Sequence, residues 1–135
     1  MGKGSNAMAN LTRRTIHLQS GEPIEVRRVR DGAYFCPVCG YPVSDNAPYE
    51  DTLSVDRGGN AVGPAFATPS YEKCESCNTR YGVTDVVTTG SLNDRWRELR
   101  LMWLDSAGWS KAALNQIREH LDISEDQLRR DAGIR

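Results

Sequence analysis

Four cysteines, the only ones in the chain, constrain the fold more than any other feature of this sequence. They form two C-x-x-C pairs, Cys36-Pro37-Val38-Cys39 and Cys74-Glu75-Ser76-Cys77. Each pair can bend into a short turn, here called a knuckle, and two knuckles complete the tetrahedral thiolate site that Zn²⁺ prefers. The next residues fit, because Gly40 adopts a positive φ freely and Asn78 is the next most tolerant type. We therefore predict one structural Zn²⁺, with Cys36, Cys39, Cys74 and Cys77 as its ligands.

Three other uses of the same cysteines stay open at this point. Two disulfides would suit a small secreted domain, but no apolar signal segment precedes the cysteines. A redox-active pair is a second use, although duplication of the motif favours ligation over thiol exchange. Iron is the third, because four thiolates also hold iron in rubredoxin-like sites. No fifth ligand is evident, so we expect a closed site that is structural rather than catalytic.

The length of 135 residues predicts one domain, with at most a small appendage. Residues 1–7 read as an expression scar ahead of a native Met8. We expect the β meander and zinc ribbon over 8–90 and a helical segment packed on the ribbon over 91–135. No apolar stretch is long enough to span a bilayer, which predicts a cytoplasmic protein with no membrane partner.

Charge is unevenly distributed along the chain. The formal net charge is −1, so bulk charge does not make the chain a polyanion binder. The stretch from Cys36 to Gly90 is acidic, whereas the native segment up to Phe35 is rich in arginine. These arginines form either a solvated face or a cationic stripe that meets phosphates or an acidic partner. They are Arg13, Arg14, Arg27, Arg28 and Arg30.

Alternation of apolar and polar residues predicts strands ahead of the first knuckle. Thr15–Gln19 alternates as a half-buried strand does, and Ile24–Arg30 resumes the pattern after a turn at residues 20–23. Asp31-Gly32 is a hairpin signal. His17 falls on the polar face of its strand, so we expect a surface histidine and not a ligand. The result is a short antiparallel meander that leads into Cys36.

The segment between the knuckles carries few structural signals. We predict an irregular excursion over Ser44–Ser70 with a brief strand near Thr52–Val55, and a returning strand at Arg80–Val83 after the second knuckle. Its carboxylates form either a plain solvated loop or an acidic interaction surface. They are Asp45, Glu50, Asp51 and Asp56.

Helical periodicity begins after Ser91, which is a good N-cap, and Gly108 is a natural stop. Trp96 and Trp103 lie on one face, and we expect them to anchor this helix on the ribbon. A second helix starts at residues 109–110, and a capping box at Ser124 opens a short third one. The predicted class is α+β: a small antiparallel zinc ribbon with a short β meander, followed by two or three helices.

The residues around both knuckles resemble the bacterial cysteine-rich CPCC-type zinc-ribbon proteins. The resemblance covers roughly 34–110 and departs at Val38, where the name-giving motif has Cys, and at Glu75, where Pro is usual. It implies a small metal-binding domain with the four cysteines as ligands, no catalytic residues and no settled activity. Some members look like immunity proteins beside bacterial toxins. It rests on Cys36-Pro37-Val38-Cys39-Gly40-Tyr41-Pro42, Tyr71-Glu72-Lys73-Cys74-Glu75-Ser76-Cys77 and Tyr81-Gly82-Val83-Thr84-Asp85.

Three function classes compete. The favoured one is a protein-interaction module that meets a partner, including a basic toxin, through its acidic loop or its helices. The alternative is a nucleic-acid-binding regulator, with Lys111–Leu128 as a helix-turn-helix. Against it, Arg118 stands where a small residue is expected and Asp122 where Gly usually turns. An enzyme is least favoured, since His17 and His120 have no evident catalytic partner. The sequence assigns no oligomeric state.

Overall fold

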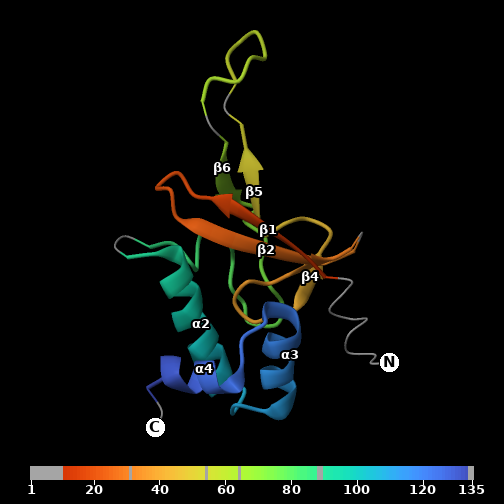
Figure 1. The fold of residues 1–135 in the computed structure, drawn as a ribbon, viewed down its shortest axis with the longest axis vertical. Helices are drawn as coiled ribbons and strands as arrows, with labels where there is room; N and C mark the ends of the chain where they lie inside the picture. Colours follow the sequence, from red (N-terminus) through yellow and green to blue (C-terminus); the bar gives the residue numbers. More distant parts are fainter. Residues whose placement is uncertain (1–10, 31, 54, 64, 88–89, 134–135) are drawn as a thin grey trace.

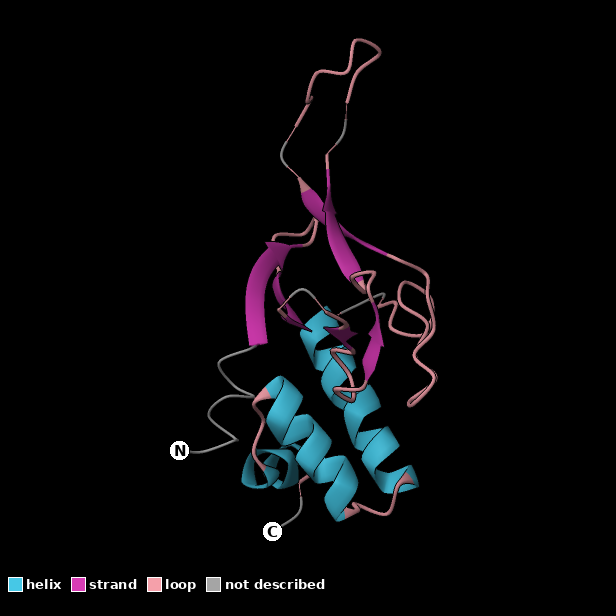
Figure 2. Ribbon diagram, turned by 90° about the vertical axis from the view of Figure 1, so that its right-hand side faces the viewer, coloured by secondary structure: helices cyan, strands magenta, loops and turns pink. Residues whose placement is uncertain are grey.

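Antiparallel strands precede the helices along the chain, which confirms the predicted α+β class (Figure 1). The computed structural model describes residues 11–30, 32–53, 55–63, 65–87 and 90–133. The predicted expression scar lies outside these residues, as does Asp31 of the predicted hairpin turn. Figure 2 shows the helices gathered at one end of the molecule and a two-stranded arm pointing away from them.

A four-stranded meander is the first layer of the structure. Its strands are β1 (Leu11–His17), β2 (Pro23–Val29), β3 (Tyr34–Phe35) and β4 (Pro42–Ser44), paired in that order. Ile16 faces Ile24 across the β1–β2 pair, and both side chains are buried. The meander was predicted, although β1 begins four residues before the expected Thr15 and ends at His17.

The excursion between the knuckles is more regular than predicted. It contains β5 (Tyr49–Thr52) and β6 (Phe66–Pro69), which pair antiparallel with Tyr49 opposite Pro69. The predicted strand at Thr52–Val55 was therefore placed too late. The pattern is misleading because β5 carries two adjacent acidic residues and β6 ends in a proline, both of which are rare in strands.

The strand predicted at Arg80–Val83 is wrong. This segment is a series of turns, and Arg80 forms only an isolated bridge with Lys73. Gly82 has φ 86°, which strand backbone does not adopt. The Thr84 hydroxyl accepts a hydrogen bond from the Arg80 amide at 2.9 Å, so a side chain takes the donor that a ladder would use.

The described helices are α2 (Leu92–Ser106), α3 (Lys111–Leu121) and α4 (Glu125–Asp131). Three serines cap them as expected, because the hydroxyls of Ser91, Ser110 and Ser124 each accept the amide three residues on. Gly108 has φ 68° and ends α2 as predicted. Within the described ranges, we find no helix with both the length and the apolar character that crossing a membrane requires.

Two apolar clusters form the core. The first joins the strands, the cysteines and Trp96, and the second joins α3 and α4 to the end of α2. Trp96 is 4% exposed and is a true anchor, as predicted. Trp103 is only partly buried and packs against both clusters. Both tryptophans therefore contact the ribbon cluster, and Trp96 is the more deeply buried of the two.

Glu22 connects the meander to α2. It lies in the β1–β2 turn, and its carboxylate accepts the backbone amides of Leu92 at 2.8 Å and Asn93 at 2.9 Å. These amides belong to the first turn of α2, where unpaired donors and the helix dipole favour a negative charge. The start of the helix is therefore held by both its own N-cap and the sheet.

Candidate metal centre

The four cysteine sulfurs lie within 4.8 Å of one another, and they come from the two knuckles predicted from the spacing. The Cys36 and Cys77 sulfurs are 3.7 Å apart, as are those of Cys39 and Cys74. Four thiolates around Zn²⁺ at about 2.3 Å stand about 3.8 Å from one another, whereas a disulfide needs about 2.05 Å. All four cysteines are free. The spacing fits one metal ion and does not fit two disulfides.

The two knuckles repeat one backbone pattern. In the first, the Gly40 amide donates to the Cys36 carbonyl at 2.8 Å, and in the second the Asn78 amide donates to the Cys74 carbonyl at 2.8 Å. Gly40 has φ 83° and Asn78 has φ 63°. The left-handed residues predicted after each second cysteine are therefore present, and they turn each chain back behind its sulfurs.

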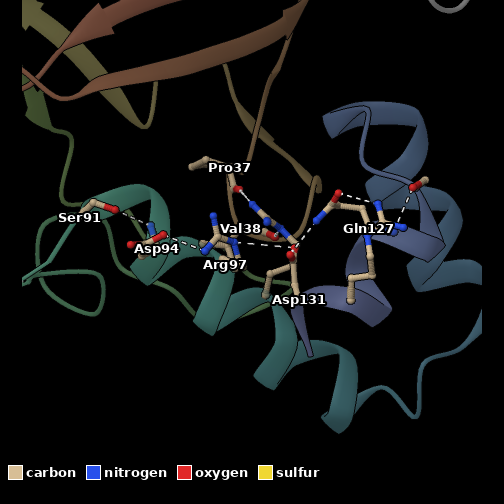
Figure 3. Close-up of polar contacts among 10 residues, drawn as sticks. Pro37, Val38, Ser91, Asp94, Arg97, Gln127 and Asp131 are labelled. Atoms are coloured by element: carbon tan, nitrogen blue, oxygen red, sulfur yellow. Dashed lines mark hydrogen bonds and ion pairs between the residues drawn. The ribbon is translucent and has the colours of Figure 1, made fainter. Parts of the chain in front are cut away.

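Side chains from α2 and α3 hold the carbonyls of the first knuckle. The Arg100 guanidinium donates to the Pro37 carbonyl at 2.8 Å and to the Val38 carbonyl at 2.7 Å (Figure 3). Gln116 donates to the Cys39 carbonyl at 2.9 Å, and His120 Nδ1 lies 2.8 Å from the Gly40 carbonyl. Four consecutive carbonyls are thus satisfied by helices that begin more than fifty residues later. We call this set the carbonyl clamp.

Arg100 is the most buried part of the carbonyl clamp, with 8% of its surface exposed. Burial lowers the pKa of its guanidinium to about 10, so it still carries a positive charge at neutral pH. The negative charge of Cys36 acts in the opposite direction and favours the cation. A buried cation close to a set of thiolates is electrostatically matched to them.

α3 approaches the first knuckle closely at Gly40. A Cβ at this position would meet the Gln116 carbonyl oxygen at 2.9 Å, which is closer than side-chain carbons come. His120 also stacks on Phe35, with ring centroids 4.2 Å apart. The His120 ring therefore packs beside the first knuckle. Gly40 is required both for its φ and for this packing.

The thiols differ in their electrostatic environment. Burial raises the pKa of Cys36, and the neighbouring thiols raise that of Cys39, whereas hydrogen bonds from Cys36 and Cys39 lower the pKa values of Cys74 and Cys77. The Thr79 hydroxyl lies 3.2 Å from the Cys77 sulfur. The four thiols are thus close enough to change one another's pKa values, and a metal ion binds them as thiolates.

The Tyr81 hydroxyl is a further feature that bears on whether the site suits a metal. Its hydroxyl is buried and has no hydrogen-bond partner among the described residues. Tyr81 lies in the same buried cluster as Cys36, Cys39 and Cys74, and burial, followed by the charge of Cys36, raises its pKa. An unused donor next to thiolates is the kind of group that supports metal-bound sulfur. The donor set and its surroundings fit a thiolate-bound dication.

Asp85 fixes the turn after the second knuckle, a role that sequence reasoning missed. One carboxylate oxygen accepts the Tyr49 hydroxyl at 2.8 Å and the Trp96 indole N–H at 2.9 Å, and the other accepts the Gly82 amide at 2.7 Å. The side chain is fully buried. It joins β5, α2 and this turn. Burial, followed by the charge of Asp85, raises the pKa of Tyr49.

The five arginines do not line up on one face, so the cationic stripe, one of the two alternatives for them, does not form as drawn. Arg13 stands opposite Arg27 on one side of the meander, and alternation places their neighbours Arg14 and Arg28 on the other. Several of the guanidinium groups have partners within the protein. Arg14 pairs with Asp51, Arg27 pairs with Glu25, and Arg28 lies over the Tyr34 ring. His17 is exposed, as expected, and is not part of the sulfur cluster.

The α3–α4 pair has a geometry that bears on the helix-turn-helix alternative. Three residues join the helices, and Asp122 adopts the left-handed conformation, with φ 58°. It therefore makes the turn that Gly usually makes. Charge remains unfavourable, because Arg129 pairs with Glu125 on the exposed side of α4, and Asp131 lies 3.8 Å from Arg97 of α2 (Figure 3). The arginines of α4 therefore mostly bind groups within the protein.

Comparison with protein-family models, with curated proteins and with solved structures finds no match for this chain. The likeness to CPCC-type proteins therefore rests on the quoted residues alone and stays a prediction.

Proposed function

We propose that this protein is a protein-interaction module whose fold is held by one structural Zn²⁺ on Cys36, Cys39, Cys74 and Cys77. Zinc bound to four thiolates supplies folding energy and no open position for a substrate. The proposal includes no catalytic role.

The carbonyl clamp carries this proposal. A catalytic zinc site keeps one position open to solvent, whereas this cluster is enclosed. Three of the four cysteines are buried, and α2 and α3 cover the first knuckle with Arg100, Gln116 and His120. Among the described residues, no histidine or carboxylate joins the four sulfurs. A centre built in this way joins the parts of a fold, which leaves function to the outer surface.

Within this class we propose a toxin-neutralising role against a basic partner. Two observations support it: the acidic character of residues 36–90, and the likeness to CPCC-type proteins, some of which look like immunity proteins. The proposal requires a reducing compartment such as the cytoplasm, because disulfide formation would remove the ligands.

Affinity capture from the source cells, with nuclease treatment, tests the proposal. We expect one recurrent basic protein to be retained by the zinc-loaded chain, to resist nuclease treatment and to be lost with Cys36→Ser. Glu119→Ala, which removes an exposed carboxylate of α3 outside both the centre and the acidic residues 36–90, is the control for a general surface change. Retention that disappears with nuclease, or that is the same with Cys36→Ser, would contradict the proposal.

The second candidate function is a nucleic-acid-binding regulator, and the left-handed turn at Asp122 favours it. We expect no significant nucleic-acid binding, because the exposed arginines do not share one face. Binding to random duplex DNA should be no tighter than about 10⁻⁴ M at physiological salt. Micromolar, salt-sensitive binding that Arg27→Ala and Arg28→Ala abolish in a fluorescence titration would replace the first proposal by this one.

A further inference from the structure

The β5–β6 hairpin projects from the body as an arm, residues 49–69 (Figures 1 and 2). Its root is anchored, because Tyr49 and Ala67 are buried in the first core cluster. The ladder pairs Tyr49–Thr52 with Phe66–Pro69, and an isolated bridge joins Val55 to Ala61 near the tip. The distal half of the arm thus extends beyond the strands and helices that make up the core.

The distal half of the arm exposes apolar side chains. Leu53 is 57% exposed, Val55 58% and Val62 57%. These three residues leave apolar side chains in water on one short hairpin, where a partner segment could cover them. A two-stranded hairpin is marginally stable in water without further packing, so a partner that covers it would also stabilise it.

The tip is nevertheless a well-formed turn. The Asp56 carboxylate accepts the amides of Gly58 at 2.9 Å and Asn60 at 3.0 Å, and the Asp56 amide donates to the Asn60 carbonyl at 2.9 Å. The hydrogen bond from the Asn60 amide is the main cause that lowers the pKa of Asp56, so this carboxylate is negatively charged at neutral pH. The arm is therefore built as a defined element.

The charge of the arm selects the kind of partner. It carries Glu50, Asp51 and Asp56 against Arg57, and Asp51 is already paired with Arg14 at 3.1 Å. A second copy is a poor occupant, because pairing two β5 strands would bring the carboxylates of both copies together. A segment that carries lysine or arginine beside apolar side chains complements both the charge and the exposed valines.

The backbone provides the means of attachment. Within the described ranges, β5 and β6 each have a single ladder neighbour, so each strand has an unpaired edge. Unpaired N–H and C=O groups on a strand edge accept an added strand from another chain. We propose that the arm binds a basic, extended segment of a partner protein by strand addition. This rests on the proposed interaction function and names its surface.

Two labelled peptides of about eight residues, a length typical of strands, test the proposal. One alternates lysine with valine and the other alternates glutamate with valine. Fluorescence anisotropy measures their binding to the full zinc-loaded chain. We expect the lysine peptide alone to bind, and N-methylation of alternate amides to abolish its binding, because strand addition needs those N–H groups.

Variants locate the binding surface. Glu50→Lys should weaken the lysine peptide at least about tenfold, and the double change Leu53→Ser with Val62→Ser should do the same. The matched controls lie on α2: Glu98→Lys reverses an exposed charge, and Met102→Ser removes an apolar side chain that is 59% exposed. We expect each control to stay within about twofold of the unmodified chain.

Several outcomes overturn the arm proposal: no peptide binding, equal binding of the glutamate or N-methylated peptide, equal losses in the controls, or self-association through the arm in sedimentation. Zinc content and partner capture are measured on the same variants. If Glu50→Lys keeps both zinc and a captured protein, the proposed function stands and the arm proposal fails. If the unmodified chain holds no zinc and captures no protein, the proposed function fails by itself.

Discussion

Gly82 shows how one missing side chain allows the turn after the second knuckle to pack against Pro69 and Tyr71. It has φ 86°, and a Cβ there would meet Pro69 Cγ at 2.5 Å and Tyr71 Cε1 at 2.8 Å. Gly59 has nearly the same φ, 82°, with nothing within 4 Å. The two glycines differ mainly in crowding, so together they separate backbone strain from packing.

We predict that Gly59→Ala destabilises the protein by about 1 kcal/mol, the cost of a left-handed alanine. Gly82→Ala should cost about 3 kcal/mol or more, because overpacking adds to the same strain. Urea unfolding of both variants measures the difference. Equal losses would show that Pro69 and Tyr71 do not press on Gly82.

Asp85 is a second residue whose effect can be isolated. Asp85→Ala leaves the Tyr49 hydroxyl, the Trp96 indole and the Gly82 amide without their acceptor. Each buried donor left unpaired costs about 1 to 3 kcal/mol, so we expect a total loss of at least about 3 kcal/mol. Asp45→Ala removes an exposed carboxylate and should be near neutral. A loss below about 1 kcal/mol for Asp85→Ala would contradict this reading.

The buried tyrosines give a prediction in alkaline solution. Burial raises the pKa values of Tyr49 and Tyr81 above the usual value of 10. Since the folded state favours the protonated phenol, this stability is fully present below pH 10 and is lost as the pH rises above it. Ultraviolet titration of the folded chain should show Tyr49 and Tyr81 ionising only with unfolding. Early ionisation of all five tyrosines would refute their burial.

At the scale of elements, Arg100 is the contact that holds α2 on the first knuckle. Arg100→Met keeps most of the side-chain volume but leaves the Pro37 and Val38 carbonyls without donors. We predict metal affinity about 10- to 100-fold weaker, the usual effect of removing a group that supports metal ligands. Chelator competition measures it. Arg118→Met on the exposed face of α3 is the control, and an equal effect there would rule out the carbonyl clamp.

Helices were predictable from sequence and the second sheet was not. Ser91, Ser110 and Ser124 mark helix starts by local chemistry, so their hydrogen bonds needed no knowledge of the fold. β5 forms because Tyr49 is buried at the arm's root, and nothing in its neighbouring residues signals this. Residues 80–83 fail as a strand because Asp85 and Thr84 take their amides, a local competition that alternation does not reveal.

At the scale of the whole molecule, the four-cysteine cluster lies where the strands meet the helices. The four cysteines could be identified from their spacing, because a knuckle is a local structure. The residues that hold the carbonyls of the first knuckle could not be identified from the sequence. Arg100, Gln116 and His120 lie far from the cysteines along the chain and look like ordinary helix residues. Asp85 and Tyr81 could not be identified from the sequence either, because their importance depends on their burial in the fold.

Removing the metal should therefore affect more than the ribbon. We predict that chelation unfolds the meander and both knuckles and releases α2, because the first core cluster contains three of the cysteines. Circular dichroism and tryptophan fluorescence should change together, and Zn²⁺ should restore both signals. Cys77→Ser should resemble the chelated protein. A stable fold after complete metal removal would show that the core suffices without the ion.

X-ray absorption at the zinc edge, together with elemental analysis of the purified chain, tests directly whether the four cysteines bind one Zn²⁺. We expect one Zn²⁺ per chain with four sulfur ligands at about 2.3 Å and no nitrogen or oxygen ligand. Fewer than four sulfurs, a light-atom ligand, or a metal-free protein whose mass shows two disulfides would contradict it.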